Sequence, residues 1–278
     1  MESYSNHINN FDVLASEDLS FVKECLKTGD EDLKRAVAVS HLVDKKIISM
    51  LIKDESVLVR RALATNDKLS KRDLYILAKD SDKEVRTNAL SNDHFSYFYL
   101  KVLALSNDPE IRLSVVSKRY VPNSILEHLT NDPDPRIRKK VAASTNFMYI
   151  PSDKLCFDEC DEVREALARN TQTSMKALRI LSYDKCSKVL DALAWNYSID
   201  KDIRHNIALS CDIDASRRVA ESDIYPETCY ILYKLNDNSI NYHLAMNRNT
   251  PTEILEELAK SDYSPVKTQA EFYLQGRK

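Results

Sequence analysis

Aliphatic residues recur along this chain with a period of 26 residues. One such residue opens each repeat and serves as its marker, at Leu33, Val59, Val85, Ile111, Ile137, Val163 and Val189. The following markers, Ala215, Ile240 and Val266, come after steps of 26, 25 and 26 residues. A fixed period in this range is typical of a solenoid, in which each repeat buries its apolar face only against its neighbours. The pattern therefore predicts about ten stacked repeats.

The apolar spacing within each repeat predicts two short helices. An apolar residue and, nearly always, Ala follow the marker at +4 and +5, as in Leu63-Ala64, and form one face of a first helix, helix A. A second apolar set at +10, +15 and +18, as in Leu69, Leu74 and Leu77, predicts helix B. Position +7 is often Asn, which tolerates the left-handed conformation that ends a helix, so we expect it to cap helix A. These residues are Asn66, Asn92, Asn170, Asn196 and Asn247.

Charged and capping residues follow the same period. Good N-cap residues stand three positions before the markers: Ser56, Asp82, Asp108, Asp134 and Asp212. Acidic residues stand five positions before the markers: Asp54, Asp80, Asp132, Asp158 and Asp184. Basic residues stand one position after them: Lys34, Arg60, Arg86, Arg112, Arg138 and Arg164. Such a column could bind nucleic-acid phosphates, but the nearby acidic column favours Asp–Arg ladders that tie one repeat to the next.

Three segments carry a family resemblance. Asp80–Arg86 and Asp132–Ala142 combine an acidic turn with an aliphatic-Arg pair, and Leu244–Pro251 combines Leu-Ala, Asn and Thr-Pro. All three resemble the leucine-rich repeat variant family, a HEAT-like family, and the resemblance covers roughly residues 33–274. It implies an all-α fold of short α and 3₁₀ helix pairs in a right-handed superhelix, and a binding role rather than a reaction. Some members carry an iron–sulfur domain on clustered cysteines, but only Cys25 stands near this N-terminus, so we expect no cofactor.

The repeats set the expected domain organisation. Residues 1–32 are expected to form an N-terminal helical cap, with a helix around Asp18–Lys27 that ends near Gly29. Residues 33–278 are expected to form the repeat solenoid, which makes a single domain overall.

Composition narrows the function classes. Two glycines in 278 residues disfavour β-rich folds and are too few for a Gly-rich phosphate loop. The histidines and cysteines are not clustered as the ligands of a metal site would be. We therefore expect no enzymatic activity. The apolar runs are too short to cross a membrane, and the first residues lack the pattern of a signal peptide. The six cysteines are scattered, as is typical of reduced thiols, so we expect a cytoplasmic protein.

Departures from the repeat mark the candidate binding residues. The usually polar positions +12 and +13 become Tyr97-Phe98 in the third repeat and Tyr149-Ile150 in the fifth. These residues could form an exposed contact patch for a partner, or they could be local repacking, and the sequence leaves both open. The only tryptophan, Trp195, stands in the variable column +6, where Arg169 of the preceding repeat also stands, and the two are candidates for a binding hot spot.

A basic region at Lys118–Lys140 carries the alternative function. Arg119, Arg136, Lys139 and Lys140 could contact an acidic partner or nucleic acid. The net charge of −3 argues against a general polyanion binder, whose affinity depends on excess cation. The sequence therefore predicts a non-enzymatic scaffold that recognises a protein partner and could inhibit or neutralise it. Nucleic-acid binding is the alternative function.

Overall fold

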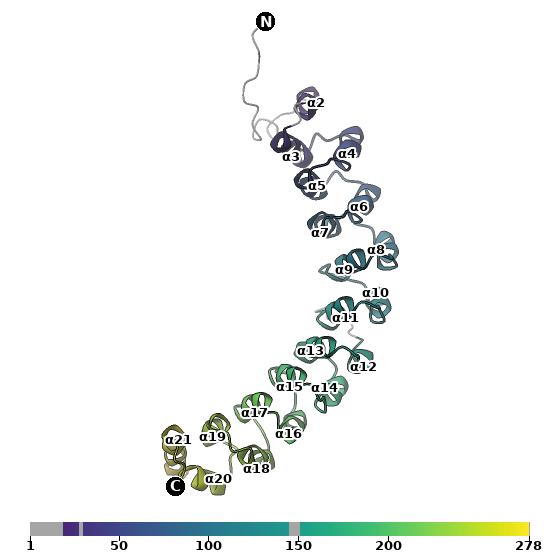
Figure 1. The fold of residues 1–278 in the computed structure, drawn as a ribbon. Coiled ribbons are helices and arrows are strands. Elements are labelled where there is room, and N and C mark those ends of the chain that lie inside the picture. Colours follow the sequence, from purple (N-terminus) through teal and green to yellow (C-terminus); the bar gives the residue numbers. More distant parts are fainter. Residues whose placement is uncertain (1–18, 28–29, 145–150, 278) are drawn as a thin grey trace, which may run out of the picture. The chain divides into compact units, whose positions relative to one another are not determined.

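The computed structural model describes residues 19–27, 30–144 and 151–277. In these ranges the chain forms twenty α-helices, α2 to α21, and no strand (Figure 1). It divides into two compact parts, which we call the N-terminal module (residues 1–125) and the C-terminal module (residues 126–278). The resemblance implied some 3₁₀ helices, whereas both helices of each described repeat are α-helical.

The N-terminal module alternates the two helices of the repeat. Its A helices are α3 (Glu31–Val39), α5 (Val57–Ala64), α7 (Lys83–Ser91) and α9 (Pro109–Val116). Its B helices are α4 (Lys45–Leu51), α6 (Lys71–Leu77) and α8 (Tyr97–Ala104). Helix α2 (Leu19–Lys27) covers the expected first helix and packs on α3, and α10 (Asn123–Leu129) crosses the division between the modules.

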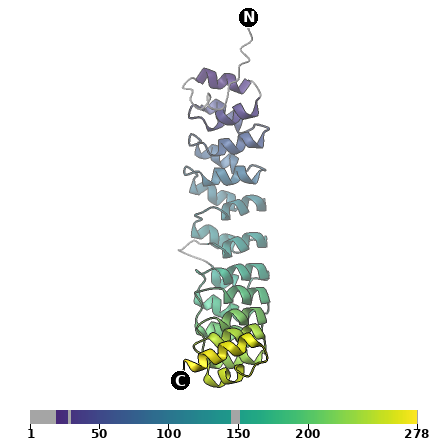
Figure 2. The same cartoon turned by 90° about the vertical axis from the view of Figure 1, so that its left-hand side faces the viewer.

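The C-terminal module continues the alternation. Its A helices are α11 (Pro135–Ala142), α13 (Asp161–Arg169), α15 (Ser187–Ala194), α17 (Ile213–Ala220), α19 (Asn238–Met246) and α21 (Ser264–Gln275). Its B helices are α12 (Ser152–Leu155), α14 (Met175–Leu181), α16 (Lys201–Leu209), α18 (Pro226–Lys234) and α20 (Thr252–Leu258). Within each module the A helices form one layer and the B helices the other, and the helices lie side by side across the stack (Figures 1 and 2).

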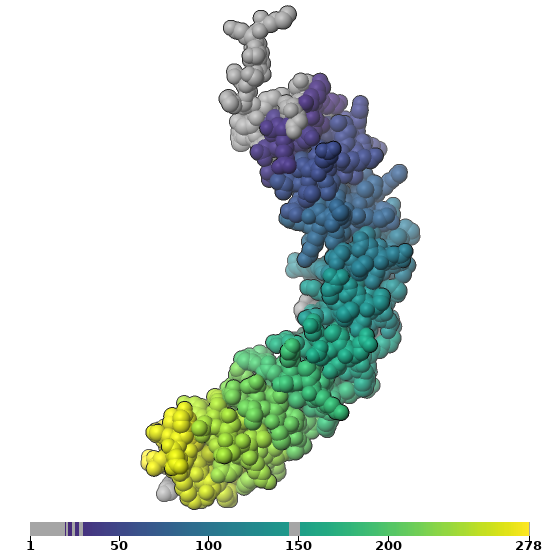
Figure 3. All heavy atoms as spheres, viewed as in Figure 1, coloured from purple at the N-terminus to yellow at the C-terminus, as the bar shows by residue number. Residues whose placement is uncertain are grey.

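The predicted apolar columns form the core of each module. The residues at 0, +4 and +5 of the second repeat, Val59, Leu63 and Ala64, are fully buried on helix A, and Leu74 and Leu77 are buried on helix B. The A helices pack more closely on one another than the B helices do, because Ala at +5 lets their backbones approach. Figure 3 shows the outer surface that the stacked repeats present within each module.

The predicted N-caps are confirmed. The side chain of each residue three positions before its marker accepts a backbone N–H of the first turn of helix A, at Ser56, Asp82, Asp108, Asp134 and Asp212. Where the column changes to Cys160 or Cys186, the side chain makes no such bond. These caps begin each A helix at a fixed residue of the repeat.

The basic column is structural, as the ladder interpretation predicts. The Arg138 guanidinium donates to the Asp158 carboxylate of the next repeat at 2.7 and 2.9 Å, and to the Asp132 carbonyl of its own preceding turn at 2.9 Å. Arg60 and Arg164 repeat this arrangement with Asp80 and Asp184. One buried arginine thus holds three chain segments together.

The carboxylate of each rung also shapes the next turn. Burial raises the pKa of the Asp158 carboxyl, but the hydrogen bonds from Arg138 and from the Cys160 N–H outweigh it, so the pKa lies below its usual value. The same opposed effects lower the pKa of Asp80, which faces Arg60 and the Asp82 N–H. Both carboxylates are therefore ionised members of the ladder at neutral pH.

The ladder stops after Arg164. Leu190, Ser216 and Asn241 occupy the basic column in the next three repeats, and Ser210 replaces the aspartate that would face Leu190. The turn after α16 contains Cys211 at φ 61°, and the turn after α18 contains Asn236 at φ 52°. Both partners of the Leu190–Ser210 rung are uncharged, so neither leaves an unpaired charge behind.

The expectation for the asparagine column was wrong in its geometry. Asn92, Asn170 and Asn247 have φ values of −65°, −78° and −78° and are extended rather than left-handed. Their amides instead bridge repeats: Asn170 Nδ2 donates to the Ala142 and Ser144 carbonyls, both at 2.8 Å. This side chain satisfies carbonyls at the end of the preceding A helix, and a left-handed backbone is not needed for it.

No helix in the described part of the chain is both long and apolar enough to span a bilayer.

Candidate functional site

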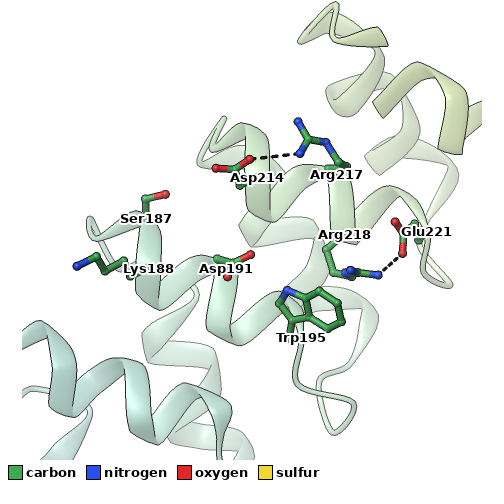
Figure 4. A pocket seen from close by; sticks show the side chains of 8 residues that line it. All are labelled: Ser187, Lys188, Asp191, Trp195, Asp214, Arg217, Arg218 and Glu221. Carbon is green, nitrogen blue, oxygen red and sulfur yellow. Dashed lines mark hydrogen bonds and ion pairs between the residues drawn. The ribbon is translucent and has the colours of Figure 1, made fainter. Parts of the chain in front are cut away.

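Trp195 lies at the C-terminal end of α15, beside a hollow of about 350 Å³. Its backbone N–H donates to the Asp191 carbonyl at 3.1 Å at the end of the helix, and this hydrogen bond fixes the backbone position from which the indole projects. The indole is 45% exposed, as its place in the variable column predicts. The hollow is lined from α15 and α17 by Ser187, Lys188, Asp191, Trp195, Asp214, Arg217, Arg218 and Glu221 (Figure 4).

A chain of contacts holds the indole in place. The guanidinium carbon of Arg218 lies 3.4 Å from the centroid of the indole ring, a cation–π contact between successive repeats. Arg218 is paired in turn with Glu221, and Glu221 Oε1 lies 3.3 Å from His243 Nε2 on α19. The indole is therefore restrained before any partner arrives, while nearly half of it stays open.

The hollow has balanced charge. Lys188, Arg217 and Arg218 line it together with three carboxylates, those of Asp191, Asp214 and Glu221. Arg217 Nη1 lies 3.4 Å from Asp214, but its buried Nε has no hydrogen-bond partner in the described structure. Such a lining suits a partner with mixed polar groups around an apolar contact rather than a polyanion.

Arg169 has a different place from the one expected. Its guanidinium pairs with Glu165 in its own helix at 3.0 Å, and the cation over the indole is Arg218 of the following repeat. The sequence does not single out Arg218 because it stands at +3, and the residue at +3 of the preceding repeat is the buried Ala192. Position +6 of one repeat faces position +3 of the next, and this relation between stacked repeats could have identified Arg218 as the partner of Trp195.

Tyr97 and Phe98 form an exposed aromatic pair at the start of α8, in the N-terminal module. Tyr97 Oη lies 3.0 Å from Ser124 Oγ, and Lys101 Nζ lies 5.3 Å from the tyrosine ring centroid. Phe98 is 67% exposed, and its ring meets Tyr99 edge-on at 5.6 Å. Tyr149 and Ile150, the equivalent candidates of the fifth repeat, lie outside the described residues.

Most cations of the basic region are already engaged. Lys118 Nζ donates to the Leu90 carbonyl, and burial lowers the pKa of this lysine. In the C-terminal module Arg136 pairs with Asp134 at 2.7 Å and Lys139 with Glu162 at 3.2 Å.

Two cations of the region are more open. Arg119 is exposed, with its guanidinium carbon 5.4 Å from the Tyr120 ring, and Lys140 is also exposed. The region therefore offers less free positive charge than its sequence suggests.

A metal site has no candidate donors in the described ranges: no three His, Cys, Asp or Glu side chains are grouped to hold an ion.

Comparisons with solved structures find helical repeat proteins of low similarity. No protein-family model and no curated protein matches the chain. A solved leucine-rich repeat variant, described as having a novel repetitive structural motif, is 25% identical over 69% of this chain and 81% of its own, with a TM-score of 0.47. An engineered protein is 13% identical over 96% of this chain and 93% of its own, with a TM-score of 0.30. A designed armadillo repeat protein is 14% identical over 94% of this chain and 100% of its own, with a TM-score of 0.16. On the helix pairs and inter-repeat ladders of its own described residues, this chain belongs to the helical-repeat α-solenoids, as its period predicts.

Proposed function

We propose that this chain is a non-enzymatic scaffold that recognises a protein partner, with Trp195 at the centre of one contact. The observation that carries the proposal is an indole that is 45% exposed yet held at 3.4 Å by Arg218. A restrained aromatic side chain loses little conformational entropy on binding, and Trp is enriched among residues that dominate interface energies. The neighbouring charged groups would supply the polar rim.

The mode of action that we propose is inhibition or neutralisation of the partner. A scaffold with no chemistry of its own acts by covering a surface of what it binds. Within this proposal, residues 1–32 cap the repeats at the N-terminus and residues 33–278 form one solenoid domain. The cytoplasm is the proposed compartment, supported by the five described cysteines, all of which are free thiols.

Affinity capture with the full chain tests the proposal. We expect Trp195→Ala to weaken capture of the partner by about 2 kcal/mol, roughly thirtyfold in affinity, as is usual for a hot-spot residue. Tyr197→Ala is the matched control, since this neighbouring aromatic side chain is the more exposed of the two and makes no ring contact in the described structure. Equal capture by the two variants would remove Trp195 from the interface.

Nucleic-acid binding through Lys118–Lys140 is the alternative, and the exposed Arg119 and Lys140 favour it. It predicts retention of DNA or RNA that falls steeply with salt and is lost when Arg136, Lys139 and Lys140 are changed to Glu. Absence of binding to both nucleic acids at low salt would eliminate this alternative. If that triple variant abolished all binding and Trp195→Ala none, the protein-partner proposal would fail.

A further inference from the structure

The B helices of the N-terminal module expose a line of apolar side chains. Met50 on α4, Ile76 on α6 and Val102 on α8 occupy the same position, +17, in three successive repeats. They are 55%, 44% and 40% exposed, so each lies on the outer surface of its helix. We call this line the Met50–Val102 stripe.

Cations border the stripe on both sides over its first two repeats. Lys46 and Arg72 stand at the start of α4 and α6, and Lys53 and Lys79 follow the ends of the same helices. All four are exposed, and none has an acidic partner among the residues that the structure describes. The stripe is therefore apolar in the middle and positive along both edges.

In the third repeat, apolar side chains replace the cations on both sides of the stripe. Phe98 and Leu105 stand on α8 and just after it, at the positions that the cations occupy in the two earlier repeats. They are 67% and 66% exposed. The face thus runs from a positively charged end at α4 and α6 to a broad apolar end at α8.

The missing acids are a property of this face and not of the fold. On the B helices of the C-terminal module, Lys176 pairs with Asp153 at 2.9 Å and Arg179 with Asp200 at 2.9 Å. Lys201 likewise pairs with Asp223 at 3.0 Å. The same fold can therefore neutralise its B-helix cations, whereas the four cations beside the stripe have no acidic partner in the described structure, and the Lys79 ammonium lies 5.4 Å from the centroid of the Tyr75 ring.

We infer that this face binds an acidic amphipathic helix of a protein partner. Packed helices lie roughly 8–10 Å apart, and the B helices lie further apart than the A helices do, so the stripe presents one apolar side chain about every 10 Å or somewhat more. Seven residues of α-helix rise about 10.5 Å, which brings one apolar residue per heptad over each repeat. Acidic residues that flank this heptad position face the two rows of cations, and a larger apolar residue at one end of the helix faces Phe98 and Leu105.

Two other occupants fit the face less well. Nucleic acid on a basic surface is usually held by bases stacked on aromatic rings, but this stripe is aliphatic. Tyr75 and Tyr99, beside it, are stacked on each other with ring centroids 4.6 Å apart. A bilayer takes up apolar side chains without regard to their spacing, so it would make no use of the regular repeat of the stripe.

A labelled synthetic peptide tests the inference, which rests on the proposed protein-binding function and specifies a partner's chemistry. The probe is a helix-forming peptide of three heptads, with Leu once per heptad and Glu on both flanks, titrated with the full chain by fluorescence anisotropy. We expect saturable binding that weakens with salt. We expect Lys46→Glu with Arg72→Glu to weaken binding by about tenfold or more, and Ile76→Ser with Val102→Ser to do the same.

Matched controls make the result decisive. Lys185→Glu with Lys234→Glu makes the same charge change on exposed lysines of the C-terminal module and should leave the affinity unchanged. A peptide with Lys in place of Glu should not bind.

The inference is overturned if the acidic peptide does not bind, or if all three double variants weaken it equally. It is also overturned if single-stranded DNA or phosphatidylserine vesicles bind more tightly than the peptide and are lost with the same variants. Capture of a protein that depends on Trp195 but not on this face would overturn this inference alone and leave the scaffold function standing.

Discussion

In five repeats a single amide group connects the repeat to the one before it, at Asn66, Asn92, Asn170, Asn196 and Asn247. Asn196 Nδ2 donates to the Ala168 carbonyl at 2.7 Å and to the Asn170 carbonyl at 3.2 Å, and Asn196 Oδ1 accepts the Ser198 N–H at 2.9 Å. The side chain is buried, so all three groups would lose their partners together without it. An aspartate could accept but could not donate to the two carbonyls.

We therefore expect Asn196→Ala to lower the free energy of unfolding by about 1–3 kcal/mol, the cost of buried polar groups without partners. Asn196→Asp should be at least as harmful, because its carboxylate would face two carbonyl oxygens. Urea unfolding followed by circular dichroism measures both. The control is Asn131→Ala, an exposed Asn whose loss should change stability by less than about 0.5 kcal/mol.

The contact between Trp195 and Arg218 has its own optical signature. Because Trp195 is the only tryptophan, its fluorescence reports on this site alone. Arg218→Ala should increase quenching by acrylamide, since it uncovers a ring face that the guanidinium shields at 3.4 Å. Arg217→Ala, which removes a neighbouring cation from the same helix, should change quenching less. Equal effects would mean that Arg218 does not cover the indole.

At the scale of helices, the Arg–Asp rung decides how two repeats are joined. Arg138 and Asp158 are only 9% and 7% exposed at their side chains, so each is a buried charge that depends on the other. The chain itself shows how such a rung can be lost, since Leu190 and Ser210 replace both partners in a later repeat. Removing one partner and removing both are thus different experiments.

Arg138→Leu alone should cost roughly 3–5 kcal/mol of unfolding free energy, because it leaves the Asp158 carboxylate buried and unpaired. Adding Asp158→Ser should restore a large part of that loss by copying the Leu190–Ser210 rung. The four members of this double-mutant cycle can be compared by urea unfolding. Strict additivity of the two single effects would show that the rung contributes no pairwise energy.

The helices and ladders could be predicted because each column contacts the same neighbour in every repeat. Marker, Ala and Asp–Arg columns all appear where the period places them. The conformation of the asparagines could not be predicted, because a local preference for left-handed backbone says nothing about hydrogen bonds to carbonyls of the preceding repeat. For the same reason Trp195 was found as an outlier in its column, while its partner Arg218 came from the next repeat.

The Met50–Val102 stripe was missed for a different physical reason. Sequence reasoning looked for aromatic departures at +12 and +13, and found Tyr97 and Phe98. An aliphatic residue at +17 looks like core in a helix that already buries +15 and +18. Only the side-chain exposure shows that +17 lies on the outer surface.

At the scale of the whole molecule, the ladders make stability depend on pH. The carboxyls of Asp80 and Asp158 have pKa values below their ordinary value, so the folded chain binds protons more weakly than the unfolded one. Their stabilisation is fully present above the unfolded pKa, about 3.9, and is lost as the pH falls below it towards the folded pKa.

The urea midpoint should therefore be flat from pH 7 to about 5 and fall steeply below about 4. Asp158→Asn should make the fall shallower, because one of the titrating ladder groups is gone, although the variant is less stable at neutral pH. A midpoint that does not change between neutral and strongly acidic solution would contradict the ionised ladder.

The asparagine bridges also bear on the order in which the repeats are completed during synthesis. Each amide reaches back to carbonyls of the repeat that precedes it, as Asn66 does to Ala38 and Asn196 to Ala168. A ribosome releases the N-terminal repeat first and needs roughly one to five seconds for the next 26 residues. During that interval the last carbonyls of a finished A helix have only water as partner. Where a repeat carries this asparagine, its synthesis thus completes the repeat before it, and a chain that stalls just before such a repeat leaves those carbonyls to water.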